Sequence, residues 1–98
     1  MARVLVPVNP QPPPVNGAFV LELLNDDVTP MEFVVATLEQ LFGLTGAEAI
    51  KVMLTVHRDG SAACAGFDTE AVAQAKADEL IALVRARDFP LSCRVVAG

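Results

Sequence analysis

Long apolar runs are missing from this chain of 98 residues, although 53% of the residues are hydrophobic. Glycine, proline and charged residues interrupt every run well short of the ~20 residues that a membrane-spanning helix needs, so no such helix is expected. The N-terminus also lacks a charged stretch followed by a long apolar one. A secretory signal is therefore not expected either.

Basic residues are scarce. Seven Lys and Arg residues stand against twelve Asp and Glu residues, which gives a formal net charge of −5. The basic residues are dispersed along the chain, whereas nucleic acids and anionic membranes attract clustered positive charge. Neither nucleic acid nor membrane is therefore expected as a partner, and the acidic balance is compatible with a cationic ligand.

Cysteine is limited to two positions, Cys64 and Cys93, each among small apolar residues in a predicted strand. No Cys-x-x-Cys or Cys/His spacing typical of zinc is present, and no cofactor is expected. Buried free thiols in a reducing cytoplasm are the favoured interpretation. A disulfide between neighbouring strands is the alternative.

The order of elements predicts one α+β domain preceded by an arm. Proline density over residues 1–17 predicts a flexible N-terminal arm, and residues 18–98 form the core domain. Strands are expected at 19–24, 61–66 and 91–96, and helices at 30–42, from Thr45 to about 57, and from Asp68 or Thr69 to about 87. This β-α-α-β-α-β order predicts a two-layer sandwich, a three-stranded sheet with three helices on one face.

Helical spacing also predicts which side chains are buried. In the second helix Ile50, Met53, Leu54 and His57 recur at i, i+3, i+4 and i+7, which puts the only histidine on the buried side. In the third helix the expected core face consists of Val72, Ala73, Ala77, Leu80, Ile81 and Val84.

Three polar residues separate the first strand from the first helix. They are followed by an N-cap residue, a proline suited to the first helical position and a capping-box acid: Thr29, Pro30 and Glu32. In an extended segment Asn25 and Asp27 point to the same side and Asp26 to the other. Asn25 and Asp27 could thus hold one ligand while Asp26 caps the helix or braces the corner. Alternatively, all three only form the turn.

His57 could complete a polar cluster with Asn25 and Asp27, although a lone histidine is often a core residue bonded to a carbonyl. The amide, carboxylate and neutral imidazole would supply three acceptors. A primary ammonium group has three donors and no acceptor, so the set matches a free α-amino group. A metal site or acid–base catalysis is less well supported, because local ligand spacing and a nucleophile motif are missing.

An apolar cavity beside this cluster could be lined by Met31, Val34, Met53, Val56 and Leu91. Plain core packing of these residues is the alternative. The two methionines would make adaptable walls for a variable side chain.

Three motifs in this order resemble the signatures of ClpS, the adaptor family that delivers N-degron substrates to a Clp protease. They are Asn25-Asp26-Asp27 with Thr29-Pro30-Met31-Glu32-Phe33-Val34, then Met53-Leu54-Thr55-Val56-His57, then Phe89-Pro90-Leu91-Ser92-Cys93. The resemblance covers roughly Val20 to Val96. It implies an antiparallel sheet and a non-enzymatic adaptor for substrates that begin with Phe, Leu, Tyr or Trp.

The same resemblance implies a role for individual residues. Those expected to handle the substrate's α-amino group and first peptide bond are Asn25, Asp26, Asp27 and His57. Those expected to line the side-chain pocket are Thr29, Met31, Val34, Met53, Val56 and Leu91, with Met31 excluding β-branched side chains. Glu70 and Lys76 match residues that contact the N-terminal domain of a ClpA-type AAA+ unfoldase. Val28 departs from the family, which commonly has an aromatic residue there.

The order of elements is also similar to the C-terminal domain of the ribosomal stalk protein L7/L12. That interpretation would make the chain a structural or interaction domain with a functional helix surface and no peptide pocket. The basic and glycine-rich helix features of that family are missing from this sequence.

Overall fold

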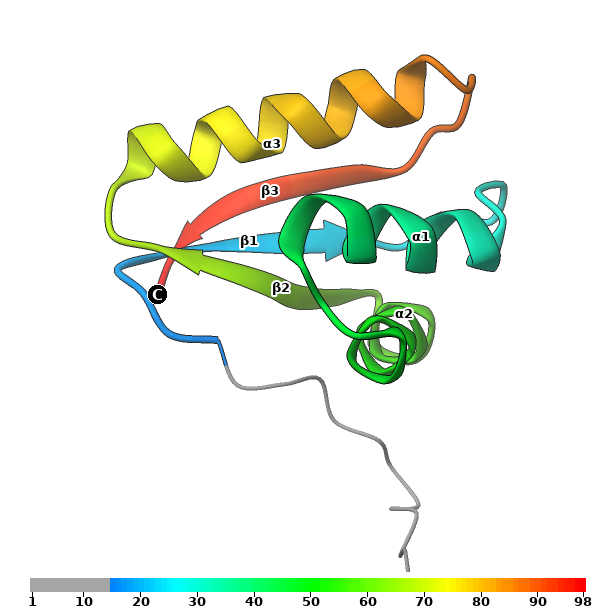
Figure 1. Cartoon of the computed structure of the whole chain (residues 1–98), viewed down its shortest axis with the longest axis horizontal. Coiled ribbons are helices and arrows are strands. Elements are labelled where there is room, and N and C mark those ends of the chain that lie inside the picture. The colour runs from blue at the N-terminus through cyan, green and yellow to red at the C-terminus, as the bar shows by residue number, and fades with distance from the viewer. Residues whose placement is uncertain (1–14) are drawn as a thin grey trace, which may run out of the picture.

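The computed structural model describes residues 15–98, so residues 1–14 of the predicted arm lie outside the described part of the chain. All six predicted elements are present in the predicted order (Figure 1). They are β1 (Phe19–Leu24), α1 (Met31–Phe42), α2 (Gly46–Asp59), β2 (Ser61–Phe67), α3 (Glu70–Arg85) and β3 (Ser92–Ala97).

The three strands form one antiparallel sheet in the order β2-β1-β3. Leu24, the last residue of β1, lies opposite Ser61 on β2 and Ser92 on β3. The start of both outer strands and the end of the central strand therefore share one end of the sheet. The register shifts between Leu21 and Glu22, which leaves Cys64 as an extra residue on β2, a β-bulge.

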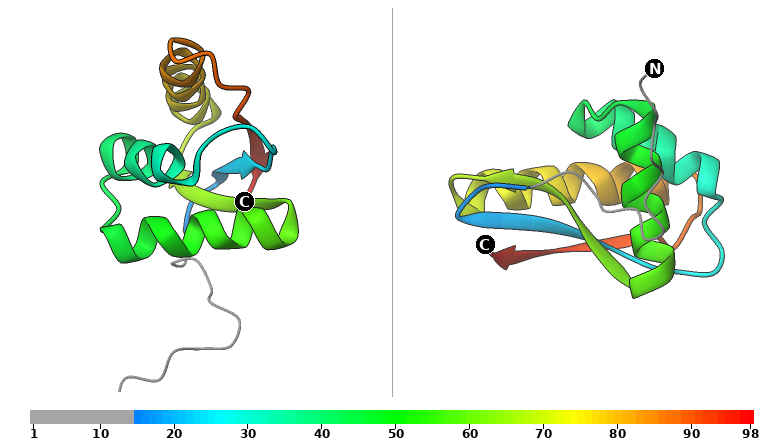
Figure 2. Two further views of the ribbon diagram at one scale, coloured as in Figure 1. Left: turned by 90° about the vertical axis from the view of Figure 1, so that its right-hand side faces the viewer. Right: turned by 90° about the horizontal axis from the view of Figure 1, so that it is seen from below.

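The predicted α+β architecture, with three helices on one face of the sheet, is confirmed. In Figure 1, α1 lies in front of the sheet, α3 runs along the β3 side and α2 lies on the β2 side. Figure 2 (left) shows α2 from the side while α1 and α3 point toward the viewer, so α2 runs across the other two helices. No helix in residues 15–98 is long and apolar enough to cross a membrane.

The core forms where the central strand faces the helices. Leu21 and Leu23 alternate along β1 and are fully buried, as are Leu38 from α1 and Leu80 from α3. On α3 most of the predicted core face is buried or half-buried, but Val72 is 53% exposed, so its assignment to the core was wrong. The small side chains of Ala73 and Ala77 bring α3 close to the sheet, and Val72 points away from this contact.

The predicted buried face of α2 was wrong for three of its four residues, and only Met53 is half-buried against the core. Ile50 and Leu54 are 45% and 39% exposed, and His57 is exposed as well. The residues that α2 buries are the neighbouring set Ala49, Val52, Thr55 and Val56. These small and β-branched side chains face β2, where Ala62 and Cys64 are buried, so the helix approaches the strand through its less bulky side.

Helix ends follow local signals at α2 but not at the start of α1. Thr45 and Glu48 form the predicted capping box, and Gly43 ends α1 in the left-handed conformation with φ 65°. The predicted cap at Thr29 was wrong, because α1 starts at Met31 after the extended residue Pro30, with no side-chain cap.

Both cysteines are free thiols. Cys64 on β2 is buried and Cys93 on β3 is half-buried. Because β1 lies between β2 and β3, the two residues do not sit on neighbouring strands, which is the arrangement that the alternative disulfide required.

Candidate functional site

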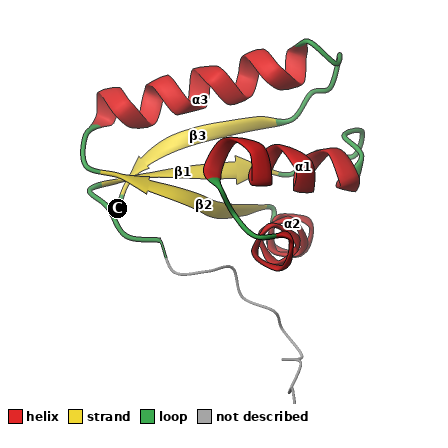
Figure 3. Ribbon diagram, viewed as in Figure 1, coloured by secondary structure: helices red, strands yellow, loops and turns green. Residues whose placement is uncertain are grey.

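A cavity of about 160 Å³ opens at the end of the sheet where β1 leads into α1. The loop between β1 and α1 and the loop between α3 and β3 lie at this same end of the molecule (Figure 3). The cavity is lined by Asn25, Asp26, Asp27, Thr29, Met31, Val34, Met53, Val56, His57 and Leu91. The structure thus brings together, around one opening, every residue predicted for the α-amino site or the side-chain pocket.

The corner after β1 is held to the end of α2. The backbone N–H of Asn25 donates to the carbonyl of Gly60 at 2.9 Å, and Gly60, in a left-handed conformation with φ 92°, ends α2. His57 lies in the last turn of that helix. This backbone bond therefore sets the polar corner beside the imidazole, although the two segments are more than 30 residues apart in sequence.

Asp26 braces the corner. Its Oδ1 accepts hydrogen bonds from the backbone N–H groups of Val28 at 2.8 Å and Thr29 at 2.7 Å. Partial burial by itself would raise the pKa of this carboxyl, but the two N–H donors outweigh burial and hold its pKa below the usual value. Asp26 thus takes the bracing role that the sequence offered as one of its options.

Removing this brace should cost stability in a pH-dependent way. A carboxylate whose pKa is lowered by folding contributes stability above its unfolded pKa and loses it as the pH falls through the folded value. Asp26→Ala should therefore destabilise the protein by about 1 kcal/mol at pH 7, and the difference from wild type should shrink below about pH 4. Urea denaturation at several pH values measures this, and a pH-independent difference would contradict the proposed cause.

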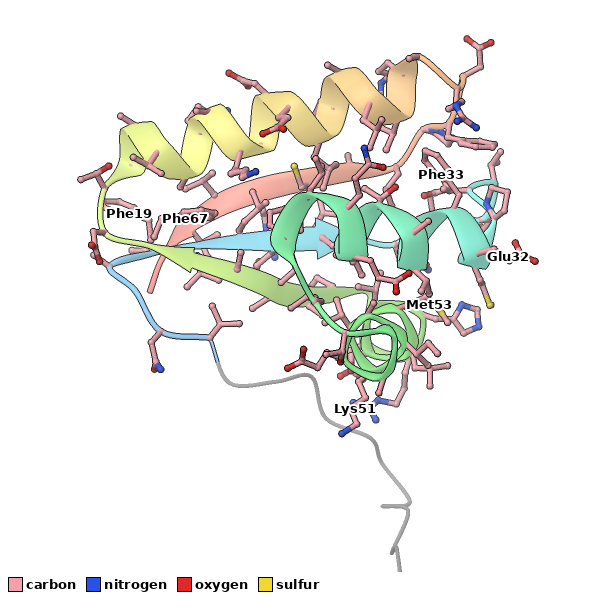
Figure 4. All side chains as sticks on the ribbon, in the orientation of Figure 1. Phe19, Glu32, Phe33, Lys51, Met53 and Phe67 are labelled. Atoms are coloured by element: carbon pink, nitrogen blue, oxygen red, sulfur yellow. The ribbon has the colours of Figure 1, made fainter. Side chains whose placement is uncertain are left out.

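Part of the cavity lining is apolar and belongs to the core. Val34 is 7% exposed, Val56 4% and Leu91 2%. Two methionines complete it: Met31 at the start of α1 and Met53 on α2, which Figure 4 shows between α2 and α1. The lining of the cavity therefore combines side chains that carry oxygen and nitrogen acceptors with side chains of aliphatic carbon and sulfur.

Leu91 is positioned by Arg85, which lies in the last turn of α3. Arg85 Nη1 donates to the backbone carbonyls of Leu91 at 2.9 Å and Phe89 at 2.6 Å. Phe89 also packs on Phe33 of α1, with ring centroids 4.9 Å apart. A basic residue in the last turn of α3 was the only sequence signal for this support.

Two predicted functional residues lie away from the cavity. Glu70 is the exposed first residue of α3, and Lys76 forms an ion pair with Glu79 at 3.2 Å while its Nζ lies 6.0 Å from the ring centre of Phe42. Glu70 and Lys76 are six positions apart on α3, so their side chains point in directions about 120° apart around the helix axis. The two residues therefore do not lie on one narrow stripe of the helix. Neither contributes to the lining of the cavity.

Among residues 15–98, no group of three His, Cys, Asp or Glu side chains is arranged to hold a metal ion. The acceptors at the corner are an amide, two carboxylates and one imidazole, of which the Asp26 carboxylate is already engaged with backbone N–H groups.

Comparison with known proteins gives one consistent result. The family model of the ATP-dependent Clp protease adaptor protein ClpS matches residues 16–94. The ATP-dependent Clp protease adapter protein ClpS of Aromatoleum aromaticum is 41% identical over 83 residues, covering 85% of this chain and 78% of that protein. The protein of the same name from a Ruegeria species is 49% identical over 71 residues, covering 72% of this chain and 62% of that protein.

A solved structure is similar over most of the chain. It is that of Agrobacterium tumefaciens ClpS2 bound to L-phenylalaninamide, with a TM-score of 0.73 and 34% sequence identity. The match covers 82% of this chain and 95% of that one.

Proposed function

This chain belongs to the ClpS family of Clp protease adaptors, and on that premise we propose that it binds substrates through a large hydrophobic N-terminal residue. As a member of this family it is an adaptor and not an enzyme. In the proposed cycle it holds Phe, Leu, Tyr or Trp at a substrate's N-terminus and delivers the substrate to a ClpA-type AAA+ unfoldase.

The observation that carries this proposal is the mixed lining of the cavity, in which polar and apolar side chains surround one space. Asn25, Asp27 and His57 bring three acceptors to this lining, and an α-ammonium group brings three donors. The first side chain of the substrate leaves the same α-carbon and would pack against the apolar residues. L-phenylalaninamide, the ligand of the similar ClpS2 structure, combines a free α-amino group with an aromatic side chain.

The volume supports an aromatic or branched aliphatic side chain. The cavity measures about 160 Å³, and an engineered protein cavity of about 150 Å³ binds benzene. Burying a Phe or Leu side chain contributes ~1.5–3 kcal/mol, and each charge-assisted hydrogen bond adds a similar amount. After the cost of association we expect a dissociation constant of about 1 μM, which suits an adaptor that must release its cargo.

The direct test compares two peptides that differ only at the α-amino group. A Phe-initiated peptide should bind with micromolar affinity, and its N-acetylated form should bind at least about 100-fold more weakly, because acetylation removes the charge and two donors. Fluorescence anisotropy or calorimetry measures both affinities. Equal binding of the two peptides would refute the α-amino site.

Delivery is tested separately, with a ClpA-type unfoldase, its protease and a reporter that begins with Phe. Adding this protein should accelerate degradation of the Phe-initiated reporter but not of a reporter that begins with Gly. We include Glu70 and Lys76 in the unfoldase contact, so Glu70→Ala and Lys76→Ala should slow degradation without weakening peptide binding. Loss of peptide binding in either variant would contradict this separation of roles.

Binding should also depend on the acceptor nitrogen of His57, which lines the same cavity. A neutral imidazole can accept a hydrogen bond from the ammonium group, and a hydrogen bond to a charged group contributes roughly 1.5–3 kcal/mol. His57→Ala should therefore weaken binding of the Phe-initiated peptide by about tenfold or more. An unchanged affinity would exclude His57 from the proposed role.

A cytoplasmic location belongs to the same proposal. Both thiols are free, which is typical of proteins in a reducing compartment.

The alternative function, an interaction domain similar to the ribosomal stalk protein, predicted that the chain has no peptide pocket. The cavity between α1 and α2 argues against that alternative.

A further inference from the structure

Both methionines of the described region line the same cavity. The chain has three methionines, and besides Met1 these are Met31 and Met53. Met31 is 48% exposed at the first position of α1, whereas Met53 is half-buried between α2 and α1 (Figure 4). A methionine that is 48% exposed therefore forms part of the lining that the proposed function assigns to the substrate side chain.

We propose that Met31 is a site of oxidation by hydrogen peroxide and organic hydroperoxides, and that its sulfoxide weakens binding of apolar side chains in the cavity. The first half of this proposal concerns reactivity alone. The second half rests on the proposed function.

The reaction needs only the peroxide. A lone pair of the Met31 sulfur attacks the outer peroxide oxygen, so that an S–O bond forms as the O–O bond breaks. The proton on the transferred oxygen passes to the departing oxygen. The sulfur loses two electrons, and hydrogen peroxide is reduced to water or a hydroperoxide to its alcohol. The product is a polar, chiral sulfoxide that methionine sulfoxide reductases convert back.

The other sulfur atoms of the described region are less available. Burial raises the pKa of the Cys64 thiol to about 12, with a smaller contribution from nearby Cys93, and burial also raises the pKa of Cys93. Since the thiolate is the reactive form of cysteine, both thiols react slowly near neutral pH. Met53 is shielded by its position between two helices. Met31, the more exposed of the two methionines, is thus the first target.

The sulfoxide matters because of the apolar side chains that line the same cavity. Val34, Val56 and Leu91 are more than nine-tenths buried and offer only carbon atoms to the cavity. A ring or isobutyl group filling the space would force the sulfoxide oxygen to give up hydrogen bonds to water, which costs affinity. We expect a loss of at least about tenfold for a Phe-initiated peptide.

The experiment treats the full-length protein with hydrogen peroxide and follows each methionine by peptide mass spectrometry. Met31 should oxidise several-fold faster than Met53 in the folded protein, and at a similar rate in urea. Affinity for the Phe-initiated peptide should fall in proportion to Met31 sulfoxide, and methionine sulfoxide reductase should restore it. Circular dichroism checks that the treated protein remains folded.

Two matched variants show which methionine causes the loss of affinity after peroxide treatment. Leucine has nearly the volume of methionine and cannot form a sulfoxide, and each variant is compared only with its own untreated form. Met31→Leu should show a ratio of treated to untreated affinity near one, and Met53→Leu should lose affinity as wild type does.

Two results would overturn the proposal: Met31 oxidising no faster than Met53, or treated Met31→Leu losing as much affinity as treated wild type. Failure of the untreated wild type to bind the Phe-initiated peptide is a different result and counts against the proposed function. The oxidation rates still decide the reactive site in that case.

Discussion

Replacing Asp27 by Asn should weaken binding of a Phe-initiated peptide by about 10- to 100-fold. The substitution keeps the shape of the side chain and removes its negative charge. A hydrogen bond from a charged donor to a charged acceptor contributes roughly 1.5–3 kcal/mol, and each 1.4 kcal/mol is about tenfold in affinity. Asp27 lines the cavity, whereas Asp26 is already engaged by two backbone N–H groups, so Asp27 carries the charge that an incoming ammonium meets.

Asp68→Asn is the matched control for this change. It removes the same charge from an exposed aspartate that follows β2 at the other end of the sheet. The two variants therefore have equal net charge, and any general attraction of a cationic peptide to an acidic protein is equally reduced in both. Equal affinities of the two variants would show that Asp27 makes no specific contact with the ligand.

Replacing Leu23 by Ala should remove about 3 kcal/mol of the free energy of unfolding. Leu23 is fully buried on the central strand, and a large-to-small change in such a position loses transfer free energy and leaves a cavity. For a domain of this size the midpoint of thermal unfolding should fall by roughly 12–24 °C. Thermal denaturation followed by circular dichroism measures the shift.

The neighbouring leucine provides the comparison. Leu24 is half-buried and points to the sheet face opposite the helices, so Leu24→Ala should cost less than about 1 kcal/mol. Similar losses for the two variants would mean that the core does not lie on the face of β1 that the alternation of buried residues indicates.

Much of this fold could be predicted from the sequence because its signals are local. The strand and helix periods, the Thr45–Glu48 capping box and the glycine after α1 each depend on residues a few positions apart. The residues around the cavity were also predicted together, but this prediction came from the order and amino-acid sequence of three motifs that resemble the signatures of the ClpS family. Physical reasoning from the same residues left core packing and simple turn formation as alternatives.

The start of α1 was mispredicted because two local interactions compete there. Thr29 and Asp26 are both good acceptors for backbone N–H groups near a helix start. In the structure the Asp26 carboxylate takes the N–H groups of Val28 and Thr29, and the helix begins two residues after Thr29. Sequence alone does not rank these options, because the outcome depends on how β1 leads into the corner.

By itself the sequence determined the number and order of elements, the polar corner, and the chemistry available to a cationic ligand. Tertiary structure decided which side of α2 is buried, since Ala49, Val52 and Val56 form a stripe next to that of Ile50, Met53 and His57. Helical period identifies both stripes, and packing against the small residues of β2 selects the first. Because the first stripe packs on β2, Met53 and His57 lie at the edge of the contact between α2 and β2. They stand beside a cavity that no local interaction encodes.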